Sequence, residues 1–114
     1  MSKSITLNTP YAAAVTLATE VPDHDAPSTV TGWGYTNYDA QTRPTILQVL
    51  KTKRYEKGTW WNGPGSFSSI WDEKTQVATL NSDKGICMGD SGGPLVVDAD
   101  GKQYGVCSYV MTRK

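Results

Sequence analysis

Apolar and polar residues alternate in short runs along this chain, and Gly, Pro, Asn and Asp separate the runs. Sustained apolar spacing of about 3.6 residues, which would indicate an amphipathic helix, is scarce. Short alternating runs with regularly spaced turn residues are typical of an all-β domain. We therefore expect an all-β fold with strands at Ile5–Leu7, Val15–Leu17, Ser28–Gly34, Ile46–Lys53, Thr75–Leu80, Pro94–Val97 and Gln103–Tyr109.

The clearest local prediction is a hairpin around the sequence Asp-Ala-Asp-Gly-Lys at residues 98–102. Gly101 supplies the positive φ that a tight hairpin requires, so the apolar runs on either side are expected to pair. Two acidic residues in this turn also raise the alternative of calcium. The remaining oxygen ligands of a calcium loop are missing, which favours a solvated turn.

Residues 59–71, "TWWNGPGSFSSIW", hold three of the four tryptophans of the chain among glycines and serines. The segment is too irregular for a helix and too aromatic for a disordered linker. Two alternatives remain: the segment packs over the β-domain, or it forms an adhesive surface loop. Because aromatic side chains usually bury most of their area, we favour packing.

The length of 114 residues suits a single domain over residues 1–114. Eleven basic residues balance eleven acidic ones, so no overall charge attracts nucleic acid or an anionic membrane. No apolar run approaches the roughly 20 residues that cross a bilayer. The first 20 residues lack the features of a signal peptide, so we expect a chain without a membrane or nucleic-acid partner.

Cys87 and Cys107 are the two cysteines of the chain and His24 is its single histidine. A disulfide between the cysteines would contribute roughly 3 kcal/mol in the chain-entropy model. Whether the bond forms depends on the two Cα atoms approaching within about 7 Å. Neither the number nor the spacing of these residues suits zinc, so we expect no metal and no cofactor.

The sequence "GICMGDSGGP" at residues 85–94 raises the question of whether Ser91 is a nucleophile. A nucleophilic serine must project from a sharply turned backbone, with N–H groups aimed at the oxygen that becomes negative. Glycines at 89, 92 and 93 permit such a backbone, and the N–H groups of Gly89 and Ser91 are candidates for the oxyanion hole. Asp90 would need a cationic partner if it were buried. The alternative is an ordinary glycine-rich turn.

The six-residue sequence "GDSGGP" at residues 89–94, followed by the apolar run "LVV", resembles the nucleophile signature of the chymotrypsin/trypsin-like serine proteases. The resemblance implies the C-terminal barrel of that family, a six-stranded antiparallel Greek-key barrel that is incomplete at its C-terminal end. Residues 1–27 resemble the connection between the two barrels of the family. Further similar segments are "SITLNTPYAAAVTLATEVPD" at 4–23, "TVTGWGYT" at 29–36, "PTILQVLKTKRY" at 44–55 and "GVCSYV" at 105–110.

The resemblance also implies roles for individual residues. Ser91 matches the nucleophile, Gly89 and Ser91 match the oxyanion-hole donors, and Asp90 matches the residue that pairs with the amino group freed on activation. Ser4 stands where the family has the triad aspartate, and the barrel that carries the triad histidine has no counterpart here. Two triad members are therefore missing, and the chain alone is expected to be close to inactive. His24 is expected to be a solvated histidine rather than a replacement base, because a base must reach Ser91.

Substrate-binding positions follow from the same resemblance: Gly85 at the base of the primary pocket, Met88 at its rim, and Ser108 and Tyr109 on the strand that pairs with the substrate backbone. An uncharged residue at 85 does not support a preference for Lys or Arg substrates. In the family, the cysteine at position 87 bonds to one on the opposite pocket wall, which would lie beyond residue 114. Cys107 departs from the family, which usually has an apolar residue there.

Two functions from different classes are consistent with these residues. The first is a serine endopeptidase that forms an acyl-enzyme at Ser91, with the histidine and aspartate supplied by a longer chain or a second polypeptide. Its partners would be a polypeptide substrate or an N-terminal protease barrel, and the resemblance implies an extracellular setting. The second is a noncatalytic pseudoprotease that binds another protein. A half-protease without a function of its own is a further alternative.

Overall fold

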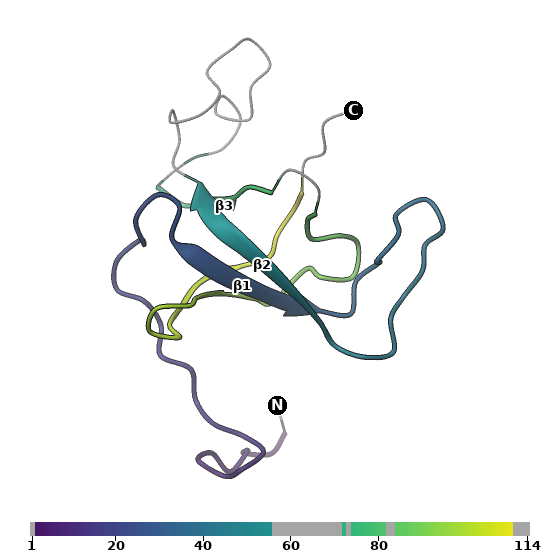
Figure 1. The fold of residues 1–114 in the computed structure, drawn as a ribbon. Helices are drawn as coiled ribbons and strands as arrows, with labels where there is room; N and C mark the ends of the chain where they lie inside the picture. Colours follow the sequence, from purple (N-terminus) through teal and green to yellow (C-terminus); the bar gives the residue numbers. More distant parts are fainter. Residues whose placement is uncertain (1, 56–71, 73, 82–83, 111–114) are drawn as a thin grey trace.

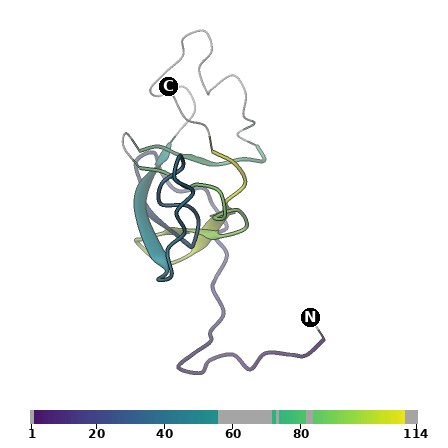
Figure 2. The ribbon, with the colours of Figure 1, turned by 90° about the vertical axis from the view of Figure 1, so that its right-hand side faces the viewer.

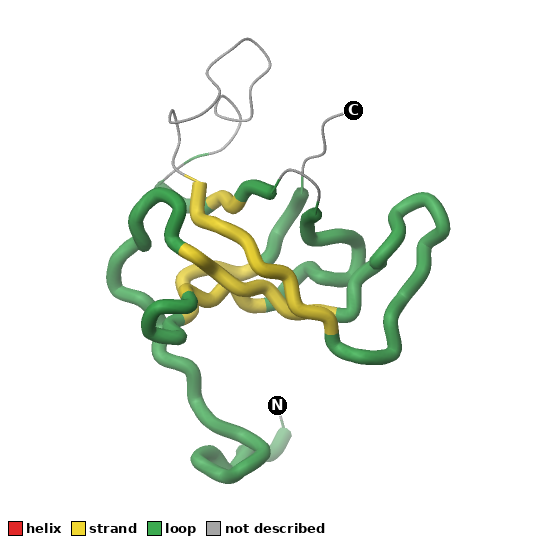
Figure 3. The backbone as a smooth tube through the Cα atoms, in the orientation of Figure 1, coloured by secondary structure: helices red, strands yellow, loops and turns green. Residues whose placement is uncertain are grey.

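The computed structural model describes residues 2–55, 72, 74–81 and 84–110. Strands and loops account for all of the described chain (Figure 3). The tryptophan-rich segment 59–71 lies outside the described residues, so its packing over the β-domain stays a prediction. Within the described residues, no helix is long and apolar enough to cross a membrane.

Five strands form one sheet, in the order β3-β2-β1-β4-β5, and every neighbouring pair is antiparallel (Figure 1). Over the described residues the sheet curls into a half-barrel, which confirms the all-β prediction and is consistent with an incomplete barrel. The six-stranded Greek-key arrangement stays a prediction. The strands are β1 at Pro27–Gly32, β2 at Gln48–Tyr55, β3 at Ala78–Thr79, β4 at Pro94–Val97 and β5 at Gln103–Val106.

The strand register explains which side chains form the core. Val30 on β1 lies between Leu50 on β2 and Leu95 on β4, so three apolar side chains form one row on the inner face. Two residues earlier on β1, Ser28 lies between Thr52 and Val97 in a second inner row. Side chains alternate between the two faces of a strand, so these rows share one face. The buried apolar residues are Val30, Tyr55, Leu95 and Val97.

The predicted hairpin between β4 and β5 is confirmed. Gly101 has a φ of 71°, and its N–H donates to the carbonyl oxygen of Val97 over 3.0 Å. The Asp98 carboxylate accepts hydrogen bonds from the Thr29 hydroxyl over 2.5 Å and from the Lys51 ammonium over 3.5 Å. This aspartate is therefore bound by side chains of β1 and β2.

Two of the predicted strands were wrong, and others extended too far: β1 ends at Gly32 rather than at residue 34, and β5 ends at Val106 rather than at residue 109. Residues 5–7 form no strand, and residues 15–17 contribute only a single parallel bridge, between Leu17 and Gln103. The prediction at 75–80 shortens to the two residues of β3. The alternating apolar residues of the N-terminal segment lack a neighbouring strand, and alternation without a partner does not make a sheet.

The N-terminal arm, residues 2–22, leaves the half-barrel and extends away from it (Figure 2). Its anchor is Gln103 on β5, whose N–H donates to Thr16 O over 3.0 Å and whose carbonyl accepts from Ala18 N–H over 2.8 Å. Large apolar side chains remain exposed before this anchor, at Ile5, Leu7, Tyr11 and Val15.

A pH-dependent loss of stability is expected from Tyr104 on β5. Its hydroxyl shares a 2.6 Å hydrogen bond with Ser28, which is fully buried, and burial raises the pKa of Tyr104 above its ordinary value of 10.0. The folded state therefore favours the neutral phenol. This stabilisation is complete below about pH 10 and is lost as the pH rises through the raised folded-state pKa.

The measurement is the free energy of unfolding by urea at a series of pH values from about 9 to 12. Tyr104→Phe should flatten the alkaline decline, whereas Tyr11→Phe should not, because Tyr11 is 97% exposed. An equal decline in wild type and Tyr104→Phe would contradict the expectation.

Candidate active site

Ser91 lies in a double turn immediately before β4. The N–H of Asp90 donates to Cys87 O over 3.0 Å, and the N–H of Gly93 donates to Asp90 O over 3.1 Å. Gly89 has a φ of 99° and Gly92 a φ of 85°, a region that L side chains rarely adopt. Ser91 itself is exposed between these glycines. The backbone therefore presents the serine hydroxyl to solvent, as the sequence predicts.

The segment after β5 fixes this turn from the other side. The N–H of Gly92 donates to Cys107 O over 2.8 Å, and the N–H of Cys107 donates to Gly93 O over 2.8 Å. The turn that carries Ser91 is therefore attached to this segment through Gly92 and Gly93, the two residues that follow the serine. Burial and the nearby negative charge of Asp90 raise the pKa of the Cys107 thiol above its ordinary value.

The two N–H groups expected to bind an oxyanion are those of Gly89 and Ser91. Among the described residues, neither group donates a hydrogen bond to a protein acceptor. Gly89 and Ser91 are both exposed, so solvent reaches these two donors, which flank one residue. They remain available to a ligand oxygen.

Asp90 points away from Ser91 and into the protein. Its Oδ1 accepts a 2.9 Å hydrogen bond from the N–H of Gly34, and its Oδ2 accepts a 3.0 Å bond from the N–H of Cys87. In the described part of the chain no cation forms an ion pair with this carboxylate. Each carboxylate oxygen therefore has a backbone donor, and the pairing of Asp90 with an amino group freed on activation stays a prediction.

Gly32 and Gly34 make room for that carboxylate, which is a feature that the sequence reasoning missed. A Cβ atom at Gly34 would lie 2.5 Å from Asp90 Cγ, and one at Gly32 would overlap Asp90 Oδ1. The Gly-x-Gly spacing of residues 32–34 was available as a signal. Two glycines on one face of a strand often indicate that another group approaches closely.

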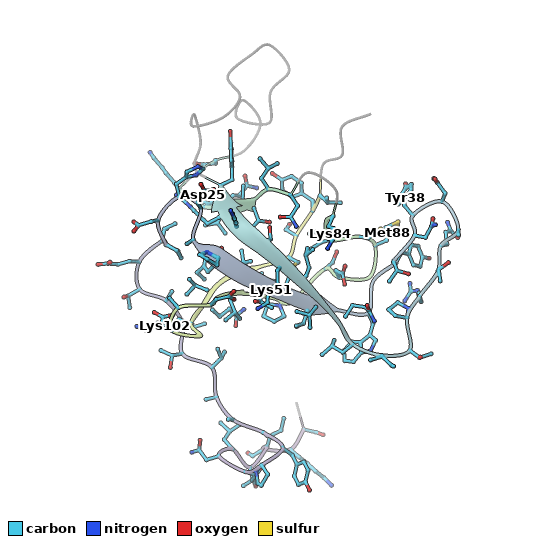
Figure 4. The ribbon with its side chains drawn as sticks, viewed as in Figure 1. Asp25, Tyr38, Lys51, Lys84, Met88 and Lys102 are labelled. Atoms are coloured by element: carbon cyan, nitrogen blue, oxygen red, sulfur yellow. The ribbon has the colours of Figure 1, made fainter. Side chains whose placement is uncertain are left out.

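His24 lies at the far end of β1 from the serine. Its Nε2 is 3.6 Å from Asp25 Oδ1, and its ring meets Tyr55 edge-on with 6.1 Å between centroids. Ser91 lies beyond the opposite end of β1, a strand of six residues that spans about 17 Å. Figure 4 shows Asp25 and Met88 at opposite ends of the sheet. His24 is therefore out of hydrogen-bond reach of Ser91.

Three of the four predicted substrate-binding residues come together. Gly85, Ser108 and Tyr109 line a cavity of about 530 Å³ on the inner face of the half-barrel. Val77 and Val110 line the same cavity and were not predicted, although Val77 lies within a predicted strand. Met88 does not line it and is 59% exposed. The walls combine apolar and polar side chains, and Lys84, the residue before Gly85, also lines the cavity.

The two cysteines of the candidate disulfide carry separate thiols in this structure. Cys87 and Cys107 are both free and half-buried, so a bond between them stays a prediction. In the part of the chain that the structure describes, no three His, Cys, Asp or Glu side chains gather into a group that could hold a metal ion.

Comparison with known proteins identifies the family. The family model for trypsin matches residues 2–114. Serine protease 1 of Canis lupus familiaris is 32% identical over 110 residues, which cover 96% of this chain and 42% of the relative. Trypsin I-P1 of Gallus gallus is 31% identical over 110 residues, with the same two shares.

Trypsin delta of Drosophila melanogaster is 31% identical over 96 residues, which cover 84% of this chain and 37% of the relative. The chain thus spans about two fifths of the length of these relatives. The family model matches almost every residue, and the glycine pair at 32 and 34 precedes the serine turn within one half-barrel. The chain therefore belongs to the trypsin-like serine protease family.

Proposed function

We propose that Ser91 is the nucleophile of a serine endopeptidase whose histidine and aspartate come from residues outside these 114. In this reaction the Ser91 oxygen attacks the peptide carbonyl, and the base takes the hydroxyl proton and passes it to the departing amine. Water then hydrolyses the acyl-enzyme and restores the serine. The substrate is a polypeptide and the setting is extracellular, both in keeping with the family.

The observation that carries this proposal is the pair of unused N–H groups of Gly89 and Ser91, next to an exposed serine hydroxyl. An oxyanion hole requires donors that no protein acceptor occupies. An ordinary glycine-rich turn satisfies its amides internally or exposes them without a nucleophile beside them. The cavity beside Gly85, Ser108 and Tyr109 supplies a surface for an apolar substrate side chain.

The missing base is also part of the proposal. His24 is the only histidine in the chain and lies at the other end of β1. Ser4, which stands at the position of the family aspartate, is exposed on the N-terminal arm. A serine without a base is a weak nucleophile, so the 114 residues alone should react slowly with substrates.

Labelling with a fluorophosphonate probe, read by intact mass, tests this function. The chain alone should remain unlabelled, and adding the N-terminal barrel of a trypsin relative should produce labelling at one site. Ser91→Ala should abolish that labelling. Rapid labelling of Ser91 in the chain alone would contradict the missing base, and labelling that survives Ser91→Ala would contradict the nucleophile.

A noncatalytic binding protein is the second candidate, and the distance between His24 and Ser91 favours it. It predicts no labelling under any condition, with or without an added barrel. The same experiment therefore separates the two functions.

A further inference from the structure

The loop between β1 and β2 places a cation beside the serine turn. The N–H of Thr36 donates to Thr42 O over 2.9 Å, and the N–H of Thr42 donates to Asn37 O over 3.3 Å, so the loop folds back on itself. This pairing brings Arg43 alongside Tyr35. The guanidinium carbon of Arg43 lies 5.0 Å from the centroid of the Tyr35 ring, within the range of a cation–π contact.

Tyr35 in turn connects this cation to the turn that carries Ser91. Its N–H donates to the carbonyl oxygen of Met88 over 2.9 Å. A Cβ atom at Gly89 would lie 3.8 Å from Nη1 of Arg43, so the guanidinium lies directly beside Gly89. Ser91 follows two positions later, at most about 7 Å along the chain. The cation is therefore close enough to contact a substrate bound at the serine.

Beyond its contact with Tyr35, the charge of Arg43 has no ion-pair partner in the described part of the protein. No carboxylate among those residues forms an ion pair with it, and the nearby Asp90 carboxylate already accepts hydrogen bonds from Gly34 and Cys87. Arg43 is also exposed. A planar guanidinium suits a carboxylate, which it can bind through two parallel hydrogen bonds.

We infer that Arg43 selects polypeptides that carry Asp or Glu within about two residues of the peptide bond that Ser91 attacks, since two extended residues span about 7 Å. This inference rests on the proposed function of Ser91 as a nucleophile for polypeptides. It adds a preference for acidic substrates, carried by a residue of the loop between β1 and β2. Arg43 is a specificity residue in this account and takes no part in proton transfer.

Binding rather than turnover tests the inference. The probe is a set of fluorescent peptide mixtures of otherwise degenerate sequence, each with Glu or Gln fixed at one position. Anisotropy is measured with the full chain carrying Ser91→Ala, so that no peptide is consumed. At low salt, Glu at one position should bind about fivefold more tightly than Gln, and added salt should reduce the difference.

Three further variants distinguish binding by the Arg43 guanidinium from a general effect of positive charge on peptide affinity. Arg43→Gln should abolish the preference for Glu, and Arg43→Lys should retain part of it. Lys102→Gln removes the same charge from the hairpin between β4 and β5, far from Met88 (Figure 4), and should leave the preference intact.

Equal affinity for Glu and Gln mixtures, a preference that survives Arg43→Gln, or no measurable affinity for any mixture would overturn the role of Arg43. None of these results changes the labelling of Ser91 by a fluorophosphonate, which tests the proposed function separately.

Discussion

Gly34→Ala is expected to lower the free energy of unfolding by about 2–3 kcal/mol, from overpacking together with a weakened hydrogen bond to a charged group. The added methyl would lie 2.5 Å from Asp90 Cγ and 2.6 and 2.7 Å from the two carboxylate oxygens. The carboxylate cannot move aside freely, because Gly34 and Cys87 both donate to it. Urea denaturation of the two proteins measures the difference.

Gly85→Ala is the matched control for this substitution. No atom lies within 4 Å of a Cβ built at Gly85, so the same added methyl meets open space there. We expect a change within about 0.5 kcal/mol, as for an ordinary surface substitution. Similar losses at Gly34 and Gly85 would show that the crowding of Asp90 is not the cause.

Asp90→Ala is expected to cost about 2–4 kcal/mol of unfolding free energy, because it leaves the N–H groups of Gly34 and Cys87 without an acceptor. Both donors belong to segments that position Ser91, so the loss should also loosen the serine turn. Asp90→Asn keeps one acceptor oxygen and should fall between the alanine variant and wild type. Urea denaturation gives the energies, and amide hydrogen exchange at Gly34 reports the loss of the bond directly.

Asp100→Ala serves as the control for charge removal. Its carboxylate accepts from Lys102 N–H over 3.0 Å on an exposed hairpin, and such a bond should be worth less than about 1 kcal/mol. An Asp90→Ala protein as stable as Asp100→Ala would contradict the role assigned to the half-buried Asp90 carboxylate.

Features determined by neighbouring residues could be predicted from the sequence. The hairpin between β4 and β5 depends on Gly101 and the apolar runs beside it, and the bounds of β4 were predicted to the residue. The exposed position of Ser91 between glycines of positive φ followed from the same local reasoning. Turn chemistry acts over four or five residues, so it is readable without knowledge of the fold.

Features that depend on distant residues could not be predicted in this way. Asp90 and Gly34 are 56 positions apart, and no residue near Asp90 in the sequence indicates that the N–H of Gly34 donates to its carboxylate. The contact between Arg43 and Gly89 depends on how the loop between β1 and β2 folds back. The segments at 5–7 and 15–17 alternate like strands, but whether they pair depends on a neighbour that alternation does not reveal.

The attachment of the N-terminal arm to Gln103 has a consequence for self-association. An unpaired edge strand can template the addition of another chain and so begin aggregation. Both backbone groups of Gln103 are occupied by the arm, and its side-chain amide donates to Gly105 O over 3.1 Å. The backbone N–H of Cys107 donates to Gly93 O, and its carbonyl oxygen accepts from the N–H of Gly92. The arm therefore covers this edge of the sheet at Gln103, and an incoming extended chain would have to displace the arm to pair with that residue.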